Sequence, residues 1–407
     1  MKVSVALIAL SLLCSSAISS DENLSLESYL SSLKQRTFAL DYTKNSEESL
    51  KFRDSWISPV QMSYSYNRSA PYDNEQTSMN AAITIDQPIF KFGGIYYGIK
   101  YAQHSYNANN LTIDQQKRSL IKQAVSLLMQ IKRTELQIER QNYQIDNSQI
   151  NLEQKREQYI NGQLDSGFLN NAIIEKNIVT QALYDLETAK ESLVSNFQSI
   201  SDNDYRTTAI PHLDYLEEEA FLEHNIDIKL RESSIERDYY QKNMIMAKYF
   251  PTISLNGSYK WERSEDFQFG NTGAGYSGET KYYSYGFRAS MPLDINTFRD
   301  IESARADYLK SKVQLDDSKR SLQTLFEKVA HNLDNIDKKI ALANENQELY
   351  EALVHDTDIL HKSGYKTAYD LKNMQNSLEI EKINIKMYYY DKQLELLELY
   401  EKVTSEV

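Results

Sequence analysis

The stretch "MQIKRTELQIERQNYQIDNSQINLEQKREQYI", residues 129–160, carries two separate series of apolar residues that repeat every seven positions. One series is Ile131, Ile138, Ile145, Leu152 and Tyr159, and the other is Met129, Leu136, Tyr143 and Ile150. The two series are offset by two positions, ~200° around a helix, so they lie on nearly opposite flanks. Such a helix needs a neighbour on each side, like a stave in the wall of a tube. A simple antiparallel coiled coil is the alternative, and it explains one series only.

Long helices are expected on both sides of this stretch. Segments 99–210 and 293–407 contain no proline and very little glycine. We predict a helix over about 97–161, which is ~65 residues or ~97 Å long. A second helix of similar length, clearest near 305–360, ends at Gly364, and the last helix repeats the two seven-residue series with Leu371, Leu378, Ile385 and Leu399 beside Ile380, Met387 and Leu394.

The chain reads as two copies of one plan. Proline-bearing, strand-like zones lie at 59–98 and 251–292, and a predicted helix precedes each of them, at 24–55 and 216–247. The order is helix, two strands, long helix, turn and helix, repeated at an offset of about 200 residues. We therefore divide the chain into a first repeat, 20–210, and a second repeat, 211–407, after an N-terminal segment 1–19.

Apolar and polar residues alternate in the four strand-like runs. The residues expected on the apolar face are Val60, Met62, Tyr64, Tyr66, Ile83, Ile85, Ile253, Leu255, Tyr259, Trp261, Tyr283, Tyr285 and Phe287. The second strand is expected to be the shortest, around Ile83 and Ile85. Alternation over about eight to ten residues suits a membrane β-barrel with a polar lumen. An antiparallel sheet on the core of a water-soluble protein has the same period and stays open as an alternative.

Four strands are too few to close a barrel, because about eight are needed to enclose a filled interior. If these strands span a membrane, several chains must contribute to one barrel. Three chains with four strands each would supply about twelve strands, within the range of known membrane barrels.

The N-terminus has the composition of a secretory signal peptide. Lys2 is followed by an apolar run at 3–13 and by small residues around Ala17–Ser19. The run is too short to span a membrane as a helix. The single cysteine, Cys14, lies inside it, so the exported chain would have no disulfide. An exported chain stabilised by packing or assembly alone fits a Gram-negative cell envelope.

Several classes of function are disfavoured. A net charge of −13 argues against nucleic acid as a partner. The mean hydropathy of −0.59 leaves no further run of about 18 apolar residues. The six histidines are scattered, and no nucleophile elbow, phosphate loop or dinucleotide motif is present. We predict no catalytic residue, no cofactor and no metal site, and hence a protein that is not an enzyme.

At this point the chain resembles the TolC family of outer-membrane efflux and secretion channels over nearly its whole mature length. The resemblance rests on the duplicated order of elements, the run "YFPTISLNGSY", the exit "QPIFKFGG" and the stretch at 222–229. It also rests on turns with glycine, then a small residue three positions later, aspartate six later and an aliphatic residue seven later. Gly364, Thr367, Asp370 and Leu371 fit this pattern fully. In the first copy Gly162, Leu169, Asn171 and Ala172 fit, but Phe168 occupies the position of the aspartate.

The resemblance implies a fold that is mainly α with a membrane β-barrel. Its expected form is a homotrimer with a shared 12-stranded barrel in the outer membrane of a Gram-negative bacterium, continued by a periplasmic α-helical tunnel. The function expected is passive export for a tripartite efflux pump or a type I secretion system. The expected partners are a periplasmic adaptor (membrane fusion protein), an inner-membrane transporter of RND or ABC type, and outer-membrane lipid. A soluble periplasmic adaptor or scaffold made of coiled coils is the competing hypothesis.

The same resemblance places the tunnel's aperture at the two helix–helix turns. Asp370 stands where family members carry an aperture aspartate, with Asn373 at a second position that is acidic elsewhere. Lys366 is a candidate for a basic latch residue, Asp165 is its candidate partner, and Phe168 replaces the usual acid. The turn residues expected to dock an adaptor are Asn161, Gly162, Gln163, Leu164, Ser363, Gly364, Tyr365 and Thr367. For Asp370 the alternative is an acid in the first turn of a helix, stabilised by the helix dipole.

Overall fold

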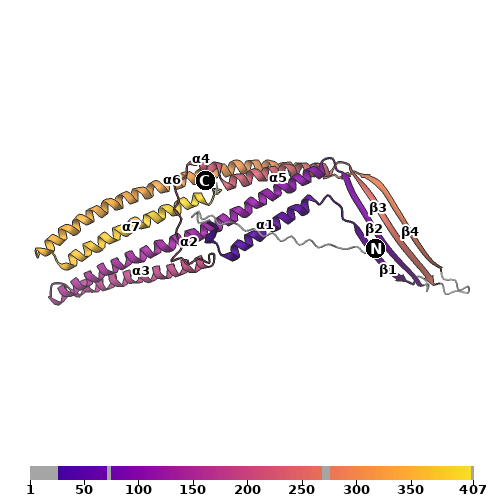
Figure 1. Ribbon diagram of the computed structural model, residues 1–407. Helices are drawn as coiled ribbons and strands as arrows, with labels where there is room; N and C mark the ends of the chain where they lie inside the picture. Colours follow the sequence, from indigo (N-terminus) through magenta and orange to yellow (C-terminus); the bar gives the residue numbers. More distant parts are fainter. Residues whose placement is uncertain (1–25, 71–74, 268–275, 405–407) are drawn as a thin grey trace, which may run out of the picture.

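The structure is a computed structural model that describes residues 26–70, 75–267 and 276–404. The predicted signal peptide, residues 1–19, lies outside the described residues. The molecule is long and curved, with a four-stranded sheet at one end and two helix–helix turns at the other (Figure 1). Among the described residues, no helix is both long and apolar enough to cross a membrane.

The two halves of the chain contain the same elements in the same order. After a short 3-10 helix, η1 (Leu26–Tyr29), the first half consists of α1 (Ser32–Arg53), β1 (Gln61–Ser69), β2 (Glu75–Phe90), α2 (Gly94–Ile160) and α3 (Ser166–Gln198). The second consists of α4 (Glu218–Glu223), α5 (Ile226–Lys248), β3 (Thr252–Phe267), β4 (Tyr276–Ser290), α6 (Thr297–Lys362) and α7 (Ala368–Tyr400). The long helices α2 and α6 have 67 and 66 residues, and α3 and α7 have 33 each.

The helices form a wall of four parallel rows, which we call staves. The first stave is α1 followed end to end by α3, the second is α2, the third is α5 followed by α7, and the fourth is α6. Helix α2 packs against α1 and α3 on one flank and against α5 and α7 on the other, while α6 packs against α5 and α7. The prediction that the long helix needs a neighbour on each flank is confirmed, and a simple two-helix coiled coil is excluded.

Backbone hydrogen bonds join the two halves of each composite stave. At the α1–α3 joint, Ser31 N–H donates to the carbonyl of Ile200 at 2.8 Å. At the α5–α7 joint, Ile226 N–H donates to the carbonyl of Lys402 at 2.8 Å, and Asn225 pairs with Val403. These bonds satisfy helix-end groups that would otherwise lack partners, so each pair of short helices acts as one interrupted rod.

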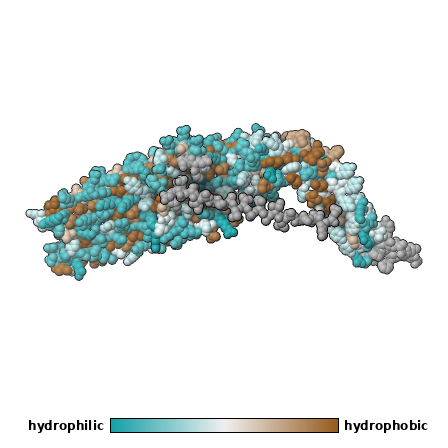
Figure 2. Space-filling model, viewed as in Figure 1, coloured by the Kyte–Doolittle hydropathy of each residue, from teal (hydrophilic) through white to brown (hydrophobic). Residues whose placement is uncertain are grey.

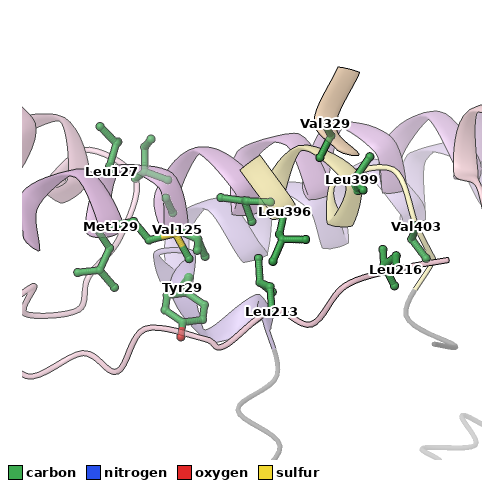
Figure 3. Packing of buried hydrophobic residues seen from close by; sticks show 14 of the residues in the cluster. Tyr29, Val125, Leu127, Met129, Leu213, Leu216, Val329, Leu396, Leu399 and Val403 are labelled. Carbon is green, nitrogen blue, oxygen red and sulfur yellow. The ribbon is translucent and has the colours of Figure 1, made fainter. Parts of the chain in front are cut away.

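The hydrophobic core lies at the waist of the molecule, around these joints. Figure 3 shows Val125 and Met129 of α2 packed near Leu396 of α7, near Leu213 of the segment between α3 and α4, and near Tyr29 of η1. Met129 and Tyr29 are almost completely buried. The largest cluster of buried hydrophobic residues in the described part of the chain is therefore at the waist, where segments far apart in the sequence meet.

The four strands form one antiparallel sheet in the order β1-β2-β3-β4. The expectation that the second strand is the shortest is wrong, because β2 has 16 residues and reaches back to Glu75. Its first half, "EQTSMNAA", has no apolar alternation and is held by ladder hydrogen bonds to β1 and β3 on both sides. Pairing with two neighbours thus extends the strand beyond its hydrophobic pattern.

Both helices predicted before the strand pairs are interrupted. The segment 24–55 forms η1 and then α1, and Ser31 caps α1 by accepting from Lys34 N–H. The segment 216–247 breaks into α4 and α5 at Asn225, whose side chain accepts from the N–H of Asp227 at 2.9 Å. An asparagine that caps a new helix competes with continuation of the preceding one.

Candidate functional site

The two helix–helix turns at the far end of the molecule have the same backbone. Gly364, with φ of 81°, follows α6, and Gly162, with φ of 71°, follows α2. Tyr365 N–H donates to the carbonyl of Leu360 at 2.8 Å, and Gln163 N–H donates to that of Gln158 at 2.8 Å. Both turns are therefore Schellman motifs, in which glycine provides the left-handed residue that ends a helix.

After the second turn, a capping box begins α7. The Thr367 hydroxyl accepts from Asp370 N–H at 3.2 Å, and Asp370 Oδ2 accepts from Thr367 N–H at 3.0 Å. The backbone and hydroxyl hydrogen bonds from Thr367 hold the pKa of the Asp370 carboxyl below its ordinary value, with a further contribution from Lys366. Asp370 is therefore fixed in position and ionised at neutral pH.

After the first turn, α3 begins without a comparable cap. Asp165 occupies the N-cap position, but its side chain makes no cap hydrogen bond and instead accepts from the Ser166 hydroxyl at 3.0 Å. Phe168 stands where Asp370 stands in the second turn, and its side chain is 56 % exposed. Equivalent positions thus carry a carboxylate in one turn and an apolar ring in the other.

The structure joins the two turns by a contact that sequence reasoning missed. The Tyr369 hydroxyl of α7 donates to Glu157 Oε1 of α2 at 3.3 Å, and that carboxylate raises the pKa of Tyr369. No ion pair links Lys366 to Asp165 within the described part of the chain. The two residues of the contact are 212 positions apart. No local spacing could therefore have indicated it.

One face of the wall is covered at the waist by η1 and by the residues that follow α7. On α2, Lys117 donates to Glu27 at 2.5 Å, Arg118 donates to the carbonyl of Val403, and Lys122 donates to Glu401 at 2.9 Å. If the wall encloses the tunnel that the resemblance implies, the lumen must stay open, so the covered face would be the outside of the wall. The lumen then lies on the opposite side of α2.

That opposite side of α2 is a continuous line of polar residues. In steps of four and three they are Gln116, Ser119, Gln123, Ser126, Gln130, Arg133, Gln137, Arg140, Gln144, Asn147 and Asn151. The two charged members are tied to α7, Arg133 to Asp391 at 2.6 Å and Arg140 to Asn384 at 3.2 Å. We call this line the amide stripe.

The partners of the amide stripe indicate which side of α7 faces the lumen. Asn384 and Asp391 are seven residues apart, and two further steps of seven toward the turn reach Ser377 and Asp370. A seven-residue step keeps the same side of a helix in a supercoiled wall. Nearer the turn, the stripe residue Asn147 accepts from Asn376 Nδ2 at 2.8 Å, one position from this series, so Asp370 lies next to the side of α7 that contacts the amide stripe. Asn373 follows it by three residues, and its Oδ1 is buried and lacks a hydrogen-bond partner.

In the sheet, the register places the predicted apolar residues on one face. Met62 pairs with Ile83, Ile83 with Tyr259, and Tyr259 with Tyr283, a single row across four strands. Directly paired residues share a face, so the alternation predicted from sequence is confirmed. Val60 alone among them lies outside its strand, one residue before β1. Tyr285 is 83 % exposed and Phe287 is 79 % exposed, which leaves a large apolar surface without a protein partner in one chain.

The neighbouring row on the other face is polar, with Gln61 paired to Thr84, Thr84 to Ser258, and Ser258 to Ser284. Figure 2 shows hydrophobic residues gathered where the helices meet the sheet. Among the described residues, no group of three or more His, Cys, Asp or Glu side chains could hold a metal ion.

The family model described as "Outer membrane efflux protein" matches residues 53–195 and 219–403, most of the described chain. The chain belongs to the outer membrane efflux protein family. A search of curated proteins gives no significant match.

This outer membrane efflux protein is also similar to solved structures. The outer membrane protein VceC of Vibrio cholerae shares 14 % identity with a TM-score of 0.69, covering 93 % of this chain and 95 % of that one. The CmeC outer membrane channel of Campylobacter jejuni shares 12 % identity with a TM-score of 0.71, covering 94 % and 86 %. The open state of the MtrE outer membrane channel of Neisseria gonorrhoeae shares 14 % identity with a TM-score of 0.64, covering 92 % and 86 %.

The family and the fold together establish the class of the protein. It is an outer-membrane efflux channel that extends into the periplasm, with a helical tunnel and a β-barrel to which each chain contributes four strands. Members of the family are trimeric transport channels, not enzymes, and act with an adaptor and an inner-membrane transporter. A soluble periplasmic adaptor is therefore not favoured.

Proposed function

We propose that three copies of this chain close edge to edge into a passive export conduit for a tripartite efflux pump or a type I secretion system. The observation that carries the proposal is the pair of free edges of the four-stave wall. Helix α2 and the α5–α7 stave have neighbours on both flanks, whereas the first stave and α6 each have one neighbour. An open wall with two free edges closes when the edge of one copy meets the opposite edge of the next.

Exposed apolar residues lie on these two edges. Ile178 of α3 is 59 % exposed and Leu349 of α6 is 57 % exposed, although each continues the apolar pattern of its helix. Tyr184 and Leu342 repeat the arrangement nearer the waist. Burying such side chains in a seam contributes about 1.5–3 kcal/mol each, which supports a stable ring rather than a monomer.

The test is to place a charge in the seam. Ile178→Glu and Leu349→Glu should each convert the detergent-solubilised trimer to monomer, because a buried unpaired carboxylate is costly. The matched control is Tyr389→Glu, at a side chain that is 55 % exposed in a groove within one chain. Multi-angle light scattering gives the mass. A trimer that survives both seam substitutions contradicts the proposed closure.

The tip of the conduit is proposed as its gate. Three-fold symmetry turns Asp370 into a ring of carboxylates on the lumen side, with Asn373 beside it and Phe168 of the first turn as an apolar ring. Lys366 and Asp165 remain candidates for a latch between neighbouring copies. The Tyr369–Glu157 hydrogen bond adds a latch within each copy that holds the two turns together.

The outer surface of the two turns is proposed as the adaptor-docking site. It comprises Asn161, Gly162, Gln163, Leu164, Ser363, Gly364, Tyr365 and Thr367, of which Tyr365 is 81 % exposed. An exposed tyrosine beside two rigid glycine turns is the kind of anchor that protein interfaces use. Tyr365→Ala should weaken pull-down of the cognate adaptor at least tenfold and leave the trimer intact. Unchanged adaptor binding would remove the turns from the docking surface.

The apolar face of the sheet is proposed to contact outer-membrane lipid. Residues such as Tyr285 and Phe287 would then lie in the hydrocarbon layer or at its interface, while the row of Gln61, Thr84, Ser258 and Ser284 would line a wet lumen. The division into repeats 20–210 and 211–407 and an inner-membrane partner of RND or ABC type belong to the same proposal. Recovery of the native protein in the soluble periplasmic fraction without detergent would contradict it.

A further inference from the structure

A cavity of about 350 Å³ lies where the staves meet the sheet. It is bounded by the end of α1, the start of α2 and the end of α5. Its floor is apolar, with Ile95 and Ile99 from α2, Met244 from α5 and Trp56 from the segment after α1. A volume of this size falls in the range of small-molecule sites.

Two glycines of α2 shape this cavity. A Cβ at Gly94 would lie 3.3 Å from the Cβ of Ala247, so α5 approaches α2 closely there. At Gly98, one turn later, a Cβ would meet only the sulfur of Met244 at 3.8 Å. The absent side chain at Gly98 therefore leaves a notch that a larger residue would fill.

The rim of the cavity is cationic. Lys91 and Lys248 both line it, and neither forms an ion pair with a carboxylate of residues 26–70, 75–267 or 276–404. Lys248 lies over the ring of Tyr249, 5.6 Å from its centroid. The third cation, Arg53, is already paired with Asp54 at 2.7 Å. Two ammonium groups are thus left to attract an anion above an apolar floor.

The cavity opens toward the lumen by two independent criteria. Gly98 precedes Arg133 of the amide stripe by five steps of seven residues, so it lies on the same side of α2. Thr252, which also lines the cavity, precedes Ile253 of β3 by one residue and so lies on the opposite, polar face of the sheet. The cavity is therefore reached from the path of the cargo and not from the lipid side.

We propose that this cavity is a binding site for amphiphilic organic anions that pass through the conduit. The anionic group would lie between Lys91 and Lys248, and the apolar body would fill the notch at Gly98 against Trp56 and Met244. This inference rests on the proposed conduit and adds a preferred class of cargo: molecules with one acidic group and a compact apolar body. The cavity itself would hold neither cations nor small inorganic ions.

The protein provides its own reporter for this site. Trp56 and Trp261 are the two tryptophans of the sequence, so Trp261→Phe leaves Trp56 as the single fluorophore. The full-length trimer carrying this change is placed in nanodiscs of zwitterionic lipid and titrated with 1-anilinonaphthalene-8-sulfonate. We expect saturable quenching of Trp56 by energy transfer. The uncharged analogue N-phenyl-1-naphthylamine, which has the same apolar body without the sulfonate, should bind at least tenfold more weakly.

Two sets of variants assign the quenching to the cavity. Lys91→Gln combined with Lys248→Gln should weaken sulfonate binding at least tenfold, and Gly98→Leu should abolish it. Gly167→Leu is the matched control, because a Cβ at Gly167 meets nothing within 4 Å and the position is at the other end of the molecule. Equal binding of both naphthalenes, or no effect of the lysine pair, overturns the proposal.

Further measurements distinguish the loss of this binding site from the loss of the conduit and from binding of membrane lipid. Trimer mass and bilayer conductance are measured on the same preparation. A conducting trimer that fails to bind the sulfonate overturns the site alone, whereas loss of trimer and conductance in the parent protein overturns the conduit. Adding phosphatidylglycerol to the nanodisc should leave the titration unchanged. Competition by this lipid would mean that the cavity opens to the membrane, which contradicts a lumen site.

Discussion

The two helix–helix turns share a backbone and differ in chemistry. Gly162 and Gly364 end their helices with the same left-handed residue and the same pair of hydrogen bonds. The second turn then continues into a capping box that fixes Asp370, whereas the first continues into an uncapped start with Phe168 at the equivalent position. Duplication has therefore preserved the geometry of the tip, while the charge is carried by one copy. The charge at the proposed gate can therefore be changed through the second turn with little effect on the first.

The largest effect is expected from removing the carboxylate of the second turn. Two unit charges ~5 Å apart in water interact by ~0.8 kcal/mol. A trivalent cation in the ring gains this energy for each of its three charges with each of three carboxylates. Asp370→Ala should therefore weaken block of single-channel current by La³⁺ at least tenfold, in planar bilayers at low salt. The control is Asp358→Ala, a carboxylate near the same turn that is paired with Lys362 at 2.6 Å. Unchanged block would return Asp370 to a purely helix-capping role.

The converse change should make the first turn resemble the second. Phe168→Asp adds a second carboxylate ring, so block by La³⁺ should become about threefold to tenfold stronger than in the parent channel. The increase is smaller than the loss in Asp370→Ala because no threonine cap holds the new carboxylate in place. If block does not change, Phe168 does not face the lumen.

Replacing either glycine should affect the two turns equally. At both Gly162 and Gly364 an added Cβ meets nothing within 4 Å, so the cost comes from the positive φ alone. Alanine at each should destabilise its turn by about 1–2 kcal/mol. The measurement is hydrogen exchange of amides in the last turns of α2 and α6, with Gly167→Ala as a control. If the two substitutions reduce amide protection by different amounts, the positive φ does not cost the same at the two glycines.

The capping residues should behave differently in the two turns. Thr367→Ala should cost about 1 kcal/mol at the start of α7. Asp165→Ala should cost little, because its side chain caps nothing. Circular dichroism and hydrogen exchange at α3 and α7 compare the two. Similar losses in both helices would contradict the difference in capping.

Thr367→Ala should also change the pH at which the channel loses its cation selectivity. The pKa of Asp370 is lowered in the fold, so its contribution to stability is present above the unfolded pKa of ~3.9 and is lost as pH falls through the lower folded value. Repulsion within the ring opposes this lowering. Without the Thr367 hydroxyl the pKa rises. Cation selectivity should then disappear at a higher pH in Thr367→Ala than in the parent, as reversal potentials in a KCl gradient can measure.

The smallest effect is expected from the contact between the two turns. Tyr369→Phe removes the hydroxyl that reaches Glu157, at a cost of about 0.5 kcal/mol for one exposed hydrogen bond. The open fraction of the channel at rest should rise about twofold, as counted in single-channel records. Glu157→Gln retains an acceptor and should change the open fraction less. A decrease in openings would exclude the contact as a latch.

The parts of the fold with a local signal could be predicted from sequence. The seven-residue series predict both long helices, and the isolated glycines at their ends predict both turns. The two-residue alternation predicts the shared face of the sheet. The extent of β2 could not be predicted, because Glu75–Asn80 are held by backbone pairing with β1 and β3 and carry no apolar pattern. The break at Asn225 depends on Val403 and Lys402, far along the chain.

In the candidate site too, local features could be predicted from the sequence and contacts between different staves could not. The capping box of Thr367 and Asp370 is local, and its spacing was visible in the sequence. The Tyr369–Glu157 bond and the cavity at Gly98 bring together residues from different staves, so they required the packed structure. Gly94, in the exit "QPIFKFGG", borders the same cavity as Gly98, and no spacing in the sequence indicates this.

The amide stripe has a consequence for how the conduit carries current. Glutamine, asparagine and serine side chains hydrogen-bond water without binding ions strongly, so the lumen should hold a continuous column of liquid water along the ~100 Å of α2. Dissolved ions then keep their hydration shells over most of that length. The conduit should behave as an ohmic resistor filled with electrolyte, with nearly all of its resistance at the tip, where we propose that Asp370 forms a ring.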